Sequence, residues 1–285
     1  MSAGTAWRLP QGFAHPLRRG GTRAAQAARS QASRIGAVED LGEILLRGFD
    51  RAIHIVAEDR ALDQVQERTG AADEKLVGGV GVGRARLGQD VIGDEVARAT
   101  SIVRYAPGSE FSPHVHTGGE EFVVLEGVFQ DEHGDFPAGS YIRNPPQSQH
   151  KPGSKEGCII FVKLWQFQPQ DRTHVRLQTH FMGSVEHSTQ QGVAVTPLYK
   201  DEFEEVSLIH LAPNAQFVLD AECGAELLVI EGAVTEGQDL LEKSSWLRTP
   251  VNSNVLAKAG KLGAKLWVKE GHLNDVDNQI ARVQQ

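Results

Sequence analysis

Residues 113–150 read PHVHTGGEEFVVLEGVFQDEHGDFPAGSYIRNPPQSQH, and this stretch decides the fold. Its apolar residues gather in short runs, and glycine, proline, asparagine and aspartate separate the runs every ~8–12 residues. The flanking runs EVARATSIVRYA at 95–106 and CIIFVKLWQF at 158–167 continue the pattern. Short runs at this spacing are typical of barrels and sandwiches of antiparallel strands. A mainly β fold is therefore expected.

The β-rich pattern occurs twice along the chain. The segment EEFVVLEG at 120–127 returns as AELLVIEG at 225–232, which is 105 residues later. Duplication of a unit of roughly 80 residues predicts two tandem barrels with one shared fold. We expect a first repeat over residues 86–170 and a second repeat over residues 193–274, joined by a polar connector.

The first repeat contains four residues that suit a metal site. His114 and His116 are two positions apart, so on a strand both imidazoles point to the same side. The glycine-rich turn 117–119 can return Glu120 beside them, and a later antiparallel strand can bring His150 to the same point. Three imidazoles and one carboxylate bind a divalent transition metal and leave coordination positions open.

The spacing of these residues resembles a known family. The pattern G-x5-H-x-H-x3-E-x6-G from Gly108 to Gly127 is similar to the first cupin motif, and G-x5-P-x4-H from Gly139 to His150 is similar to the second. Within the second motif, Gln147 stands where the family has glycine and Ser154 where it has asparagine. Neither departure affects a ligand position, so only the turn geometry is put in doubt.

Residues 90–273 most resemble the cupin domain of ChrR-like anti-sigma factors. The resemblance implies two tandem double-stranded β-helix (cupin or jelly-roll) barrels, with one divalent metal held by His114, His116, Glu120 and His150. We expect the metal to be zinc, with iron, manganese, nickel and cobalt as alternatives. In that family an N-terminal helical domain with a His/Cys zinc site holds the sigma factor. Because residues 1–85 contain no cysteine, we expect the sensor half without the sigma-binding half.

The second repeat lacks the ligand set. At the 105-residue offset, Leu219, Ala221, Ala225 and Val255 stand where the four ligands stand in the first repeat. Apolar side chains at these positions favour a filled barrel interior, and an empty lipophilic pocket is the alternative. We therefore predict a degenerate second cupin that binds no metal.

Residues 1–85 are expected to form an N-terminal extension. Residues 1–38 hold six arginines and no acid, and we expect a basic disordered segment, with an organelle transit peptide, which has a similar composition, as the alternative. The apolar spacing over residues 41–66 predicts an amphipathic helix. The glycines in GGVGVG at 78–83 lack the remaining residues of a nucleotide-binding loop, so we expect a Gly-rich linker.

Composition limits the partners. The formal net charge of −8 argues against a nucleic-acid partner, and the sequence has no apolar run near the ~20 residues of a membrane helix. Two cysteines, Cys158 and Cys223, do not build a disulfide framework, which favours the cytoplasm; an organelle is the alternative if the transit peptide is real. A small-molecule ligand and a homodimer both stay open.

Three functions fit a metal with open coordination positions. The first is a metal-bound sensor or regulatory module. The second is a metal-dependent dioxygenase that acts on a small diketone or aryl ketone. The third is a structural or interaction protein whose metal holds the barrel shut. Whether the chain is an enzyme stays open at the sequence level. Arg104, Tyr105, Gln149 and Lys163 are candidate polar neighbours of the metal.

Overall fold

The structure is a computed structural model, and it describes residues 53–56, 82–89 and 98–283. All of them lie in one compact unit, Asp50–Gln285. The basic segment 1–38 lies outside the described residues, as do the linker residues before Val82 and most of the helix predicted over 41–66. Within the described ranges, no helix has the length and apolar character of a membrane span.

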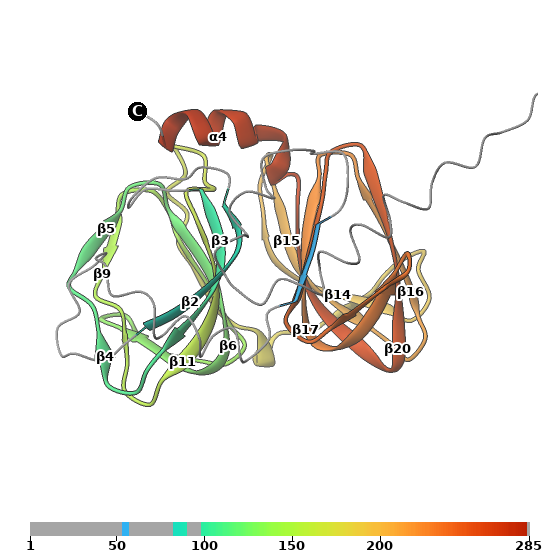
Figure 1. The fold of residues 1–285 in the computed structure, drawn as a ribbon, viewed down its shortest axis with the longest axis horizontal. Coiled ribbons are helices and arrows are strands. Elements are labelled where there is room, and N and C mark those ends of the chain that lie inside the picture. The colour runs from blue at the N-terminus through green and yellow to red at the C-terminus, as the bar shows by residue number, and fades with distance from the viewer. Residues whose placement is uncertain (1–52, 57–81, 90–97, 284–285) are drawn as a thin grey trace, which may run out of the picture. The chain divides into compact units, whose positions relative to one another are not determined.

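The first repeat is built on a nine-stranded sheet whose main path runs β12-β8-β6-β11-β3-β2 (Figure 1). Its strands are β2 (Val82–Gln89), β3 (Ala99–Tyr105), β4 (Ser109–Glu110), β6 (Glu120–Asp131), β7 (Gly134–Pro137), β8 (Ser140–Asn144), β10 (Gly153–Ser154), β11 (Cys158–Leu164) and β12 (Val175–Gln178). A separate two-stranded sheet joins β5 (His114–His116) to β9 (Ser148–His150).

The second repeat has a nine-stranded sheet of its own, with the main path β1-β19-β17-β20-β15-β14-β13. Its strands are β1 (Ile53–Val56), β13 (Val185–Glu186), β14 (Val193–Lys200), β15 (Glu205–Leu211), β16 (Gln216–Ala221), β17 (Ala225–Glu236), β18 (Asp239–Glu242), β19 (Ser245–Thr249) and β20 (Ser253–Glu270). The described helices are the short 3-10 turns η2 (Thr179–Phe181) and η3 (His272–Asp275) and the helix α4 (Val276–Val283). The prediction of a mainly β fold is confirmed.

The duplication read from the sequence is visible in the strands. β6 and β17 have twelve residues each and begin 105 residues apart, and β8 and β19 have five residues each at the same offset. Each long strand bends at a glycine in the left-handed region, Gly127 at φ +70° and Gly232 at φ +71°. A Cβ atom at either glycine would lie about 2 Å from the carbonyl oxygen of Gly157 or Gly263, so only glycine fits there.

The helix predicted over residues 41–66 is wrong at Ile53–Val56, which form β1. β1 pairs antiparallel with β19, where Ile53 lies opposite Arg248. In the first repeat, β12 pairs with β8 in the matching register, with Val175 opposite Arg143. Each sheet therefore receives an edge strand from the segment that precedes the other repeat. Three β-branched residues in four favour a strand once a partner edge is present, which outweighs the helical spacing.

The core has three parts. One apolar cluster fills the interior of each repeat. A third cluster joins the outer faces of the two sheets, with Phe161 and Tyr141 from the first repeat and Trp246 and Trp267 from the second. The rings of Phe161 and Trp267 meet edge to face at 5.1 Å between centroids. Burial of these aromatic rings makes the two repeats one packed body.

Buried ion pairs cross the same interface reciprocally. The ammonium group of Lys163 contacts Glu226 of the second repeat, and the ammonium group of Lys269 contacts Glu121 of the first. All four side chains are at most 1% exposed. The residue pairs correspond to each other in the two repeats, because Lys269 follows Lys163 by 106 residues and Glu226 follows Glu121 by 105. This reciprocal pattern is that of an isologous interface.

The C-terminal helix of the second repeat docks on the first repeat. Gln279 of α4 accepts a hydrogen bond from Arg98 at 2.5 Å, and Arg282 donates to the carbonyl oxygen of Phe167 at 3.0 Å. The predicted second repeat ends at residue 274, so this helix was not predicted from the sequence. Its docking adds a second, polar connection between the repeats.

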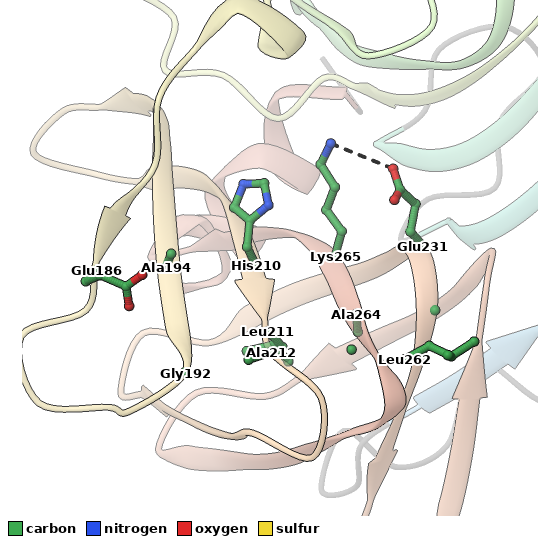
Figure 2. Close-up of a pocket in the computed structure, with 12 residues that line it drawn as sticks. Glu186, Gly192, Ala194, His210, Leu211, Ala212, Glu231, Leu262, Ala264 and Lys265 are labelled. Atoms are coloured by element: carbon green, nitrogen blue, oxygen red, sulfur yellow. Dashed lines mark ion pairs between the residues drawn. The ribbon is translucent and has the colours of Figure 1, made fainter.

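The outside of the second repeat carries an open hollow of about 610 Å3 (Figure 2). Lys265 and Glu231 on neighbouring strands form an ion pair at 3.9 Å there, and His210 lies opposite Lys265 on β15. The hollow is distinct from the interior of this repeat, which is packed with buried apolar side chains. The prediction of a filled second interior is confirmed.

Candidate metal centre

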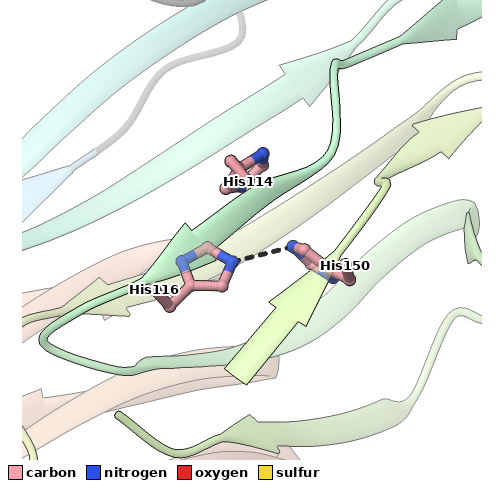
Figure 3. A group of neighbouring side chains, drawn as sticks. All are labelled: His114, His116 and His150. Atoms are coloured by element: carbon pink, nitrogen blue, oxygen red, sulfur yellow. Dashed lines mark hydrogen bonds between the residues drawn. The ribbon is translucent and has the colours of Figure 1, made fainter. Parts of the chain in front are cut away.

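The three histidines are presented by the small sheet of β5 and β9. His114 lies opposite His150 in the antiparallel register, and His116 lies opposite Ser148. Alternation along β5 puts His114 and His116 on the same face, as the spacing predicts. Figure 3 shows the three rings turned toward one another across the two strands. The ring centroids are 4.7 Å apart for His114–His116 and for His116–His150, and 5.2 Å apart for His114–His150.

A tight turn brings Glu120 back to the histidines. The backbone amide of Gly119 donates to the carbonyl oxygen of His116 at 3.3 Å, and Gly119 has a φ of +80°. A Cβ atom at Gly118 would lie 2.1 Å from the ring of Trp165, so the turn is packed too closely for a side chain. β6 begins at Glu120, directly after this turn.

The donor atoms of the three histidines lie close together, and the carboxylate of Glu120 lies beside two of them. The three histidines each offer a ring nitrogen within 4.8 Å of the other two. The Nε2 atoms of His116 and His150 are 2.8 Å apart, and Oε2 of Glu120 lies 3.4 Å from the first and 3.6 Å from the second. Ligand atoms that each bind one ion at about 2.0–2.2 Å lie no more than about 4.4 Å apart, so these three separations fit a shared ion.

Hydrogen bonds on the far side of two rings fix their orientation. Nδ1 of His114 faces the carbonyl oxygen of Ser112 at 2.9 Å, and Nδ1 of His150 faces Oδ2 of Asp131 at 3.3 Å. Each contact calls for a proton on Nδ1, which leaves a lone pair on Nε2. A carboxylate or carbonyl behind the ring is the usual support of a metal-bound histidine.

The pKa shifts of His116 and Glu120 suit metal binding, whereas the pKa shift of His150 favours its protonated form. Burial lowers the pKa of His116, although the Glu120 carboxylate opposes this. Burial raises the pKa of Glu120, but the charges of His116 and His150 and the hydrogen bond from Asn144 lower it further, so the net shift is downward. For His150, burial lowers the pKa and the contacts with Asp131 and Glu120 raise it to a larger extent. A neutral imidazole and an ionised carboxylate are the forms that bind metals.

Sequence reasoning missed two residues of this site. Asn144 donates to Oε2 of Glu120 at 3.2 Å, and Asp131 supports His150. The pairing register of β6 with β11 shifts between Ile159 and Ile160, so simple alternation from Glu120 puts Asp131 on the wrong face.

Of the four candidate neighbours of the metal, Lys163 lies away from the site. Lys163 points into the interface between the repeats, where it contacts Glu226, so its prediction as a neighbour of the metal is wrong. Gln149 is exposed. Tyr105 packs edge to face on Phe111 and Phe129 in the interior. Arg104 is half-buried on β3.

The two departures from the second cupin motif keep its geometry. Gln147 adopts a φ of +71°, the left-handed conformation that glycine favours, and its backbone amide donates to the carbonyl oxygen of His116 at 2.8 Å. Ser154 donates its hydroxyl to the carbonyl oxygen of Val128 at 2.6 Å. The turn before β9 is therefore made without the usual glycine.

The second repeat has the same strand pairing but carries apolar residues at the positions that correspond to the ligands. Leu219 lies opposite Val255, in the register that pairs His114 with His150. The side chains at all four corresponding positions are buried within its interior cluster; they are Leu219, Ala221, Ala225 and Val255. Because none of these side chains carries a donor atom, the second repeat has the fold of the site without its chemistry.

A family model described as the ChrR Cupin-like domain matches residues 68–168. This segment is a ChrR cupin-like domain. The match covers β2 to β11 and so includes every residue of the site described above. A comparison of the whole sequence with curated proteins gives no match.

Solved structures share the fold of both repeats. A candidate dioxygenase from Nostoc punctiforme has a TM-score of 0.58 at 15% identity, covering 79% of this chain and 84% of its own. The Escherichia coli protein Ylba has a TM-score of 0.56 at 14% identity, covering 83% and 98%. Salicylate 1,2-dioxygenase from Pseudoaminobacter salicylatoxidans, solved as adducts with gentisate, has a TM-score of 0.52 at 12% identity, covering 93% and 94%. Identities this low show a common cupin fold.

Proposed function

We propose that the chain is a metal-binding cupin protein whose first repeat holds one divalent transition metal. His114, His116, Glu120 and His150 would be its ligands. The observation that supports this most strongly is the meeting of three ring nitrogens within 4.8 Å of one another beside the buried carboxylate of Glu120. Three imidazoles and a carboxylate suit zinc, iron, manganese, nickel or cobalt, and zinc remains our first expectation.

The surroundings of the site support binding over a chance cluster. The Nε2 atoms of His116 and His150 are 2.8 Å apart, within hydrogen-bond distance of each other and within reach of one shared ion. The partial exposure of His114 and His116 gives the site a connection to solvent, whereas His150 and Glu120 are buried behind them. Coordination positions on the solvent side would be open to water or a small molecule.

Elemental analysis of protein purified without added metal tests the proposal. We expect about one equivalent of transition metal per wild-type chain and loss of that metal in the double variant His114→Ala/His150→Ala. The matched control is His174→Ala/His180→Ala, which removes two exposed histidines and should keep the metal. Full occupancy in the first variant would overturn the proposal.

For the biological role we propose a metal-bound sensor or regulatory module. The match of residues 68–168 to the ChrR cupin-like domain supports this. Residues 1–85 contain no cysteine, so a His/Cys zinc site is not part of the role proposed for that segment. Affinity purification from the native cell tests it: recovery of a specific partner that depends on His114 and His150 is expected, and a partner set unchanged in the double variant would count against it.

The second candidate role is a metal-dependent dioxygenase for a small diketone or aryl ketone. Two structures with the same fold are named as a candidate dioxygenase and as salicylate 1,2-dioxygenase, which favours this alternative. A ferrous ion bound by histidines and a carboxylate with open positions supplies oxygen activation. Protein loaded with Fe(II) should then consume O2 with a panel of 1,3-diketones and hydroxyaryl ketones. No consumption above that of His114→Ala/His150→Ala favours the regulatory role or a structural metal.

A further inference from the structure

The carboxylate of Glu120 lies at a corner where two strands meet. β6 and β8 pair so that Glu120 lies opposite Asn144 and Glu121 lies opposite Arg143. Successive residues of a strand point to opposite faces. Glu120 and Asn144 therefore face the site, where they hydrogen-bond to each other at 3.2 Å, and Glu121 and Arg143 face the second repeat.

The second repeat holds the back of this corner with two charged side chains. Lys269, at the end of β20, contacts Oε2 of Glu121 and lies 2.9 Å from Oε2 of Glu204. The other carboxylate oxygen of Glu204 accepts a hydrogen bond from the guanidinium of Arg143. Charges of alternating sign thus run from Glu121 through Lys269 and Glu204 to Arg143. Each of these four side chains is at most 5% exposed.

We propose that Lys269 and Glu204 are positioning residues for the metal site in the other repeat. They fix β6 and β8 at Glu121 and Arg143, and each of these residues is adjacent in sequence to a residue of the site. The inference rests on the proposed metal site. It means that the second repeat, which lacks the ligands, helps to position the metal site of the first repeat. Outer residues that hold a ligand in place are worth about 10–100-fold in metal affinity when they contact the ligand directly. The present contact acts through one peptide unit, so we expect about tenfold.

The reciprocal contact offers a matched control within the chain. Lys163 contacts Glu226 across the same interface, and its side chain is equally buried. Glu226 follows Ala225, and Ala225 pairs with Thr249 on the neighbouring strand. Loss of Lys163 therefore leaves a similarly buried carboxylate without its lysine, but beside an alanine instead of a ligand.

The experiment compares Lys269→Met with Lys163→Met in the full-length chain. Co2+ is the probe: its affinity is measured by competition with a chelator, and its visible absorption spectrum reports the ligand geometry. Both variants should unfold at a lower temperature in the presence of chelator. Lys269→Met alone should lose about tenfold in Co2+ affinity and change the spectrum. Equal affinities and identical spectra in the two variants would overturn the proposal.

Two further variants test the proposal if Lys269→Met does not fold. Glu204→Gln removes one charge at nearly constant shape and should lower Co2+ affinity less than Lys269→Met does. The double variant Lys269→Met/Glu121→Gln removes both partners, so it should regain stability while the affinity stays low. Wild-type affinity in either variant counts against positioning. Absence of Co2+ binding by the wild-type chain would refute the metal site itself, an outcome distinct from all of these.

Discussion

Asp131 supplies the sharpest test of the site, because one of its carboxylate oxygens is already committed. The backbone amide of His133 donates to Oδ1 at 2.7 Å, and Oδ2 faces Nδ1 of His150 at 3.3 Å. The side chain is only 1% exposed, so water does not readily take over either contact. In an Asp131→Asn variant, the amide oxygen must accept from His133, and the amide NH2 group then faces His150.

This replacement reverses the hydrogen-bond demand on His150. An NH2 group calls for a lone pair on Nδ1, so the proton moves to Nε2, the atom that faces the proposed metal. Loss of an outer carboxylate costs about 10–100-fold in metal affinity, or about 1.4–2.7 kcal/mol. Because Asp131→Asn also favours the wrong tautomer of His150, we expect its loss of metal affinity near the upper limit of this range. Asp131→Ala removes the same charge without imposing a tautomer, so we expect about tenfold for it.

Competition between the protein and a chelator for Zn2+ or Co2+ measures both variants. The control is Glu236→Gln, at the corresponding position of the second repeat, which should leave the affinity at the wild-type level. The test depends on which of the two Asp131 variants has the lower metal affinity. If Asp131→Ala binds metal more weakly than Asp131→Asn, or if both bind like the wild type, the assignment of Nε2 of His150 as the ligand atom is refuted.

The remaining predictions concern stability. Burial lowers the pKa of His272 to about 3 against the opposing effect of Glu226, whereas an unfolded histidine titrates near 6.5. Between these pH values the unfolded chain binds one more proton, so the free energy of unfolding falls as the pH falls, by about 1.4 kcal/mol per pH unit. The variant His272→Gln should remove this contribution from the pH dependence of the free energy of unfolding, measured with urea. An unchanged pH dependence would contradict the prediction. Alanine at Gly127 or at Gly232 should each cost at least about 2 kcal/mol, because positive φ and a nearby carbonyl oxygen exclude Cβ. Gly183→Ala, where a Cβ meets open space, should change stability by no more than about 0.5 kcal/mol in the same denaturation assay, and equal costs at all three sites would refute the steric argument.

The candidate ligand set could be proposed from the sequence because its geometry is local. The two-residue step from His114 to His116 and the glycine-rich turn before Glu120 fix three side chains within seven residues. Strand alternation then orients the two histidines without knowledge of the rest of the fold. The motif spacing supplied His150, and the antiparallel pairing of β5 with β9 shows how it reaches the site.

Asp131 and the docked helix could not be predicted, for two different reasons. Asp131 is on β6 with Glu120, but an irregularity in the pairing with β11 reverses the parity between them, and the sequence does not mark that reversal beyond a glycine at 127. α4 depends on contacts with residues more than one hundred positions away, such as that of Gln279 with Arg98. Spacing within a segment carries no information on such partners.

The strand β1 shows how a tertiary partner decides between two local structures. Ile53–Val56 fit a helical spacing within the longer segment 41–66, and the spacing alone predicts a helix. The exposed edge of β19 needs hydrogen-bond partners, and a short run of β-branched residues can provide them. The corresponding edge of β8 is covered by β12, so the same need is met in both repeats.

The reciprocal interface explains why the second repeat can lack every ligand and still retain its charged residues. Because each lysine reaches the glutamate of the other repeat, removal of either repeat takes away the cross-interface ion-pair partner of a lysine and of a glutamate in the one that remains. The same exchange holds for the edge strands, since each sheet is completed by the segment that precedes the other repeat. A repeat in this arrangement is required for packing whether or not it binds a metal. The positions that face its own interior are then free to become apolar, whereas Glu226, Lys269 and Trp246, which face the other repeat, are not.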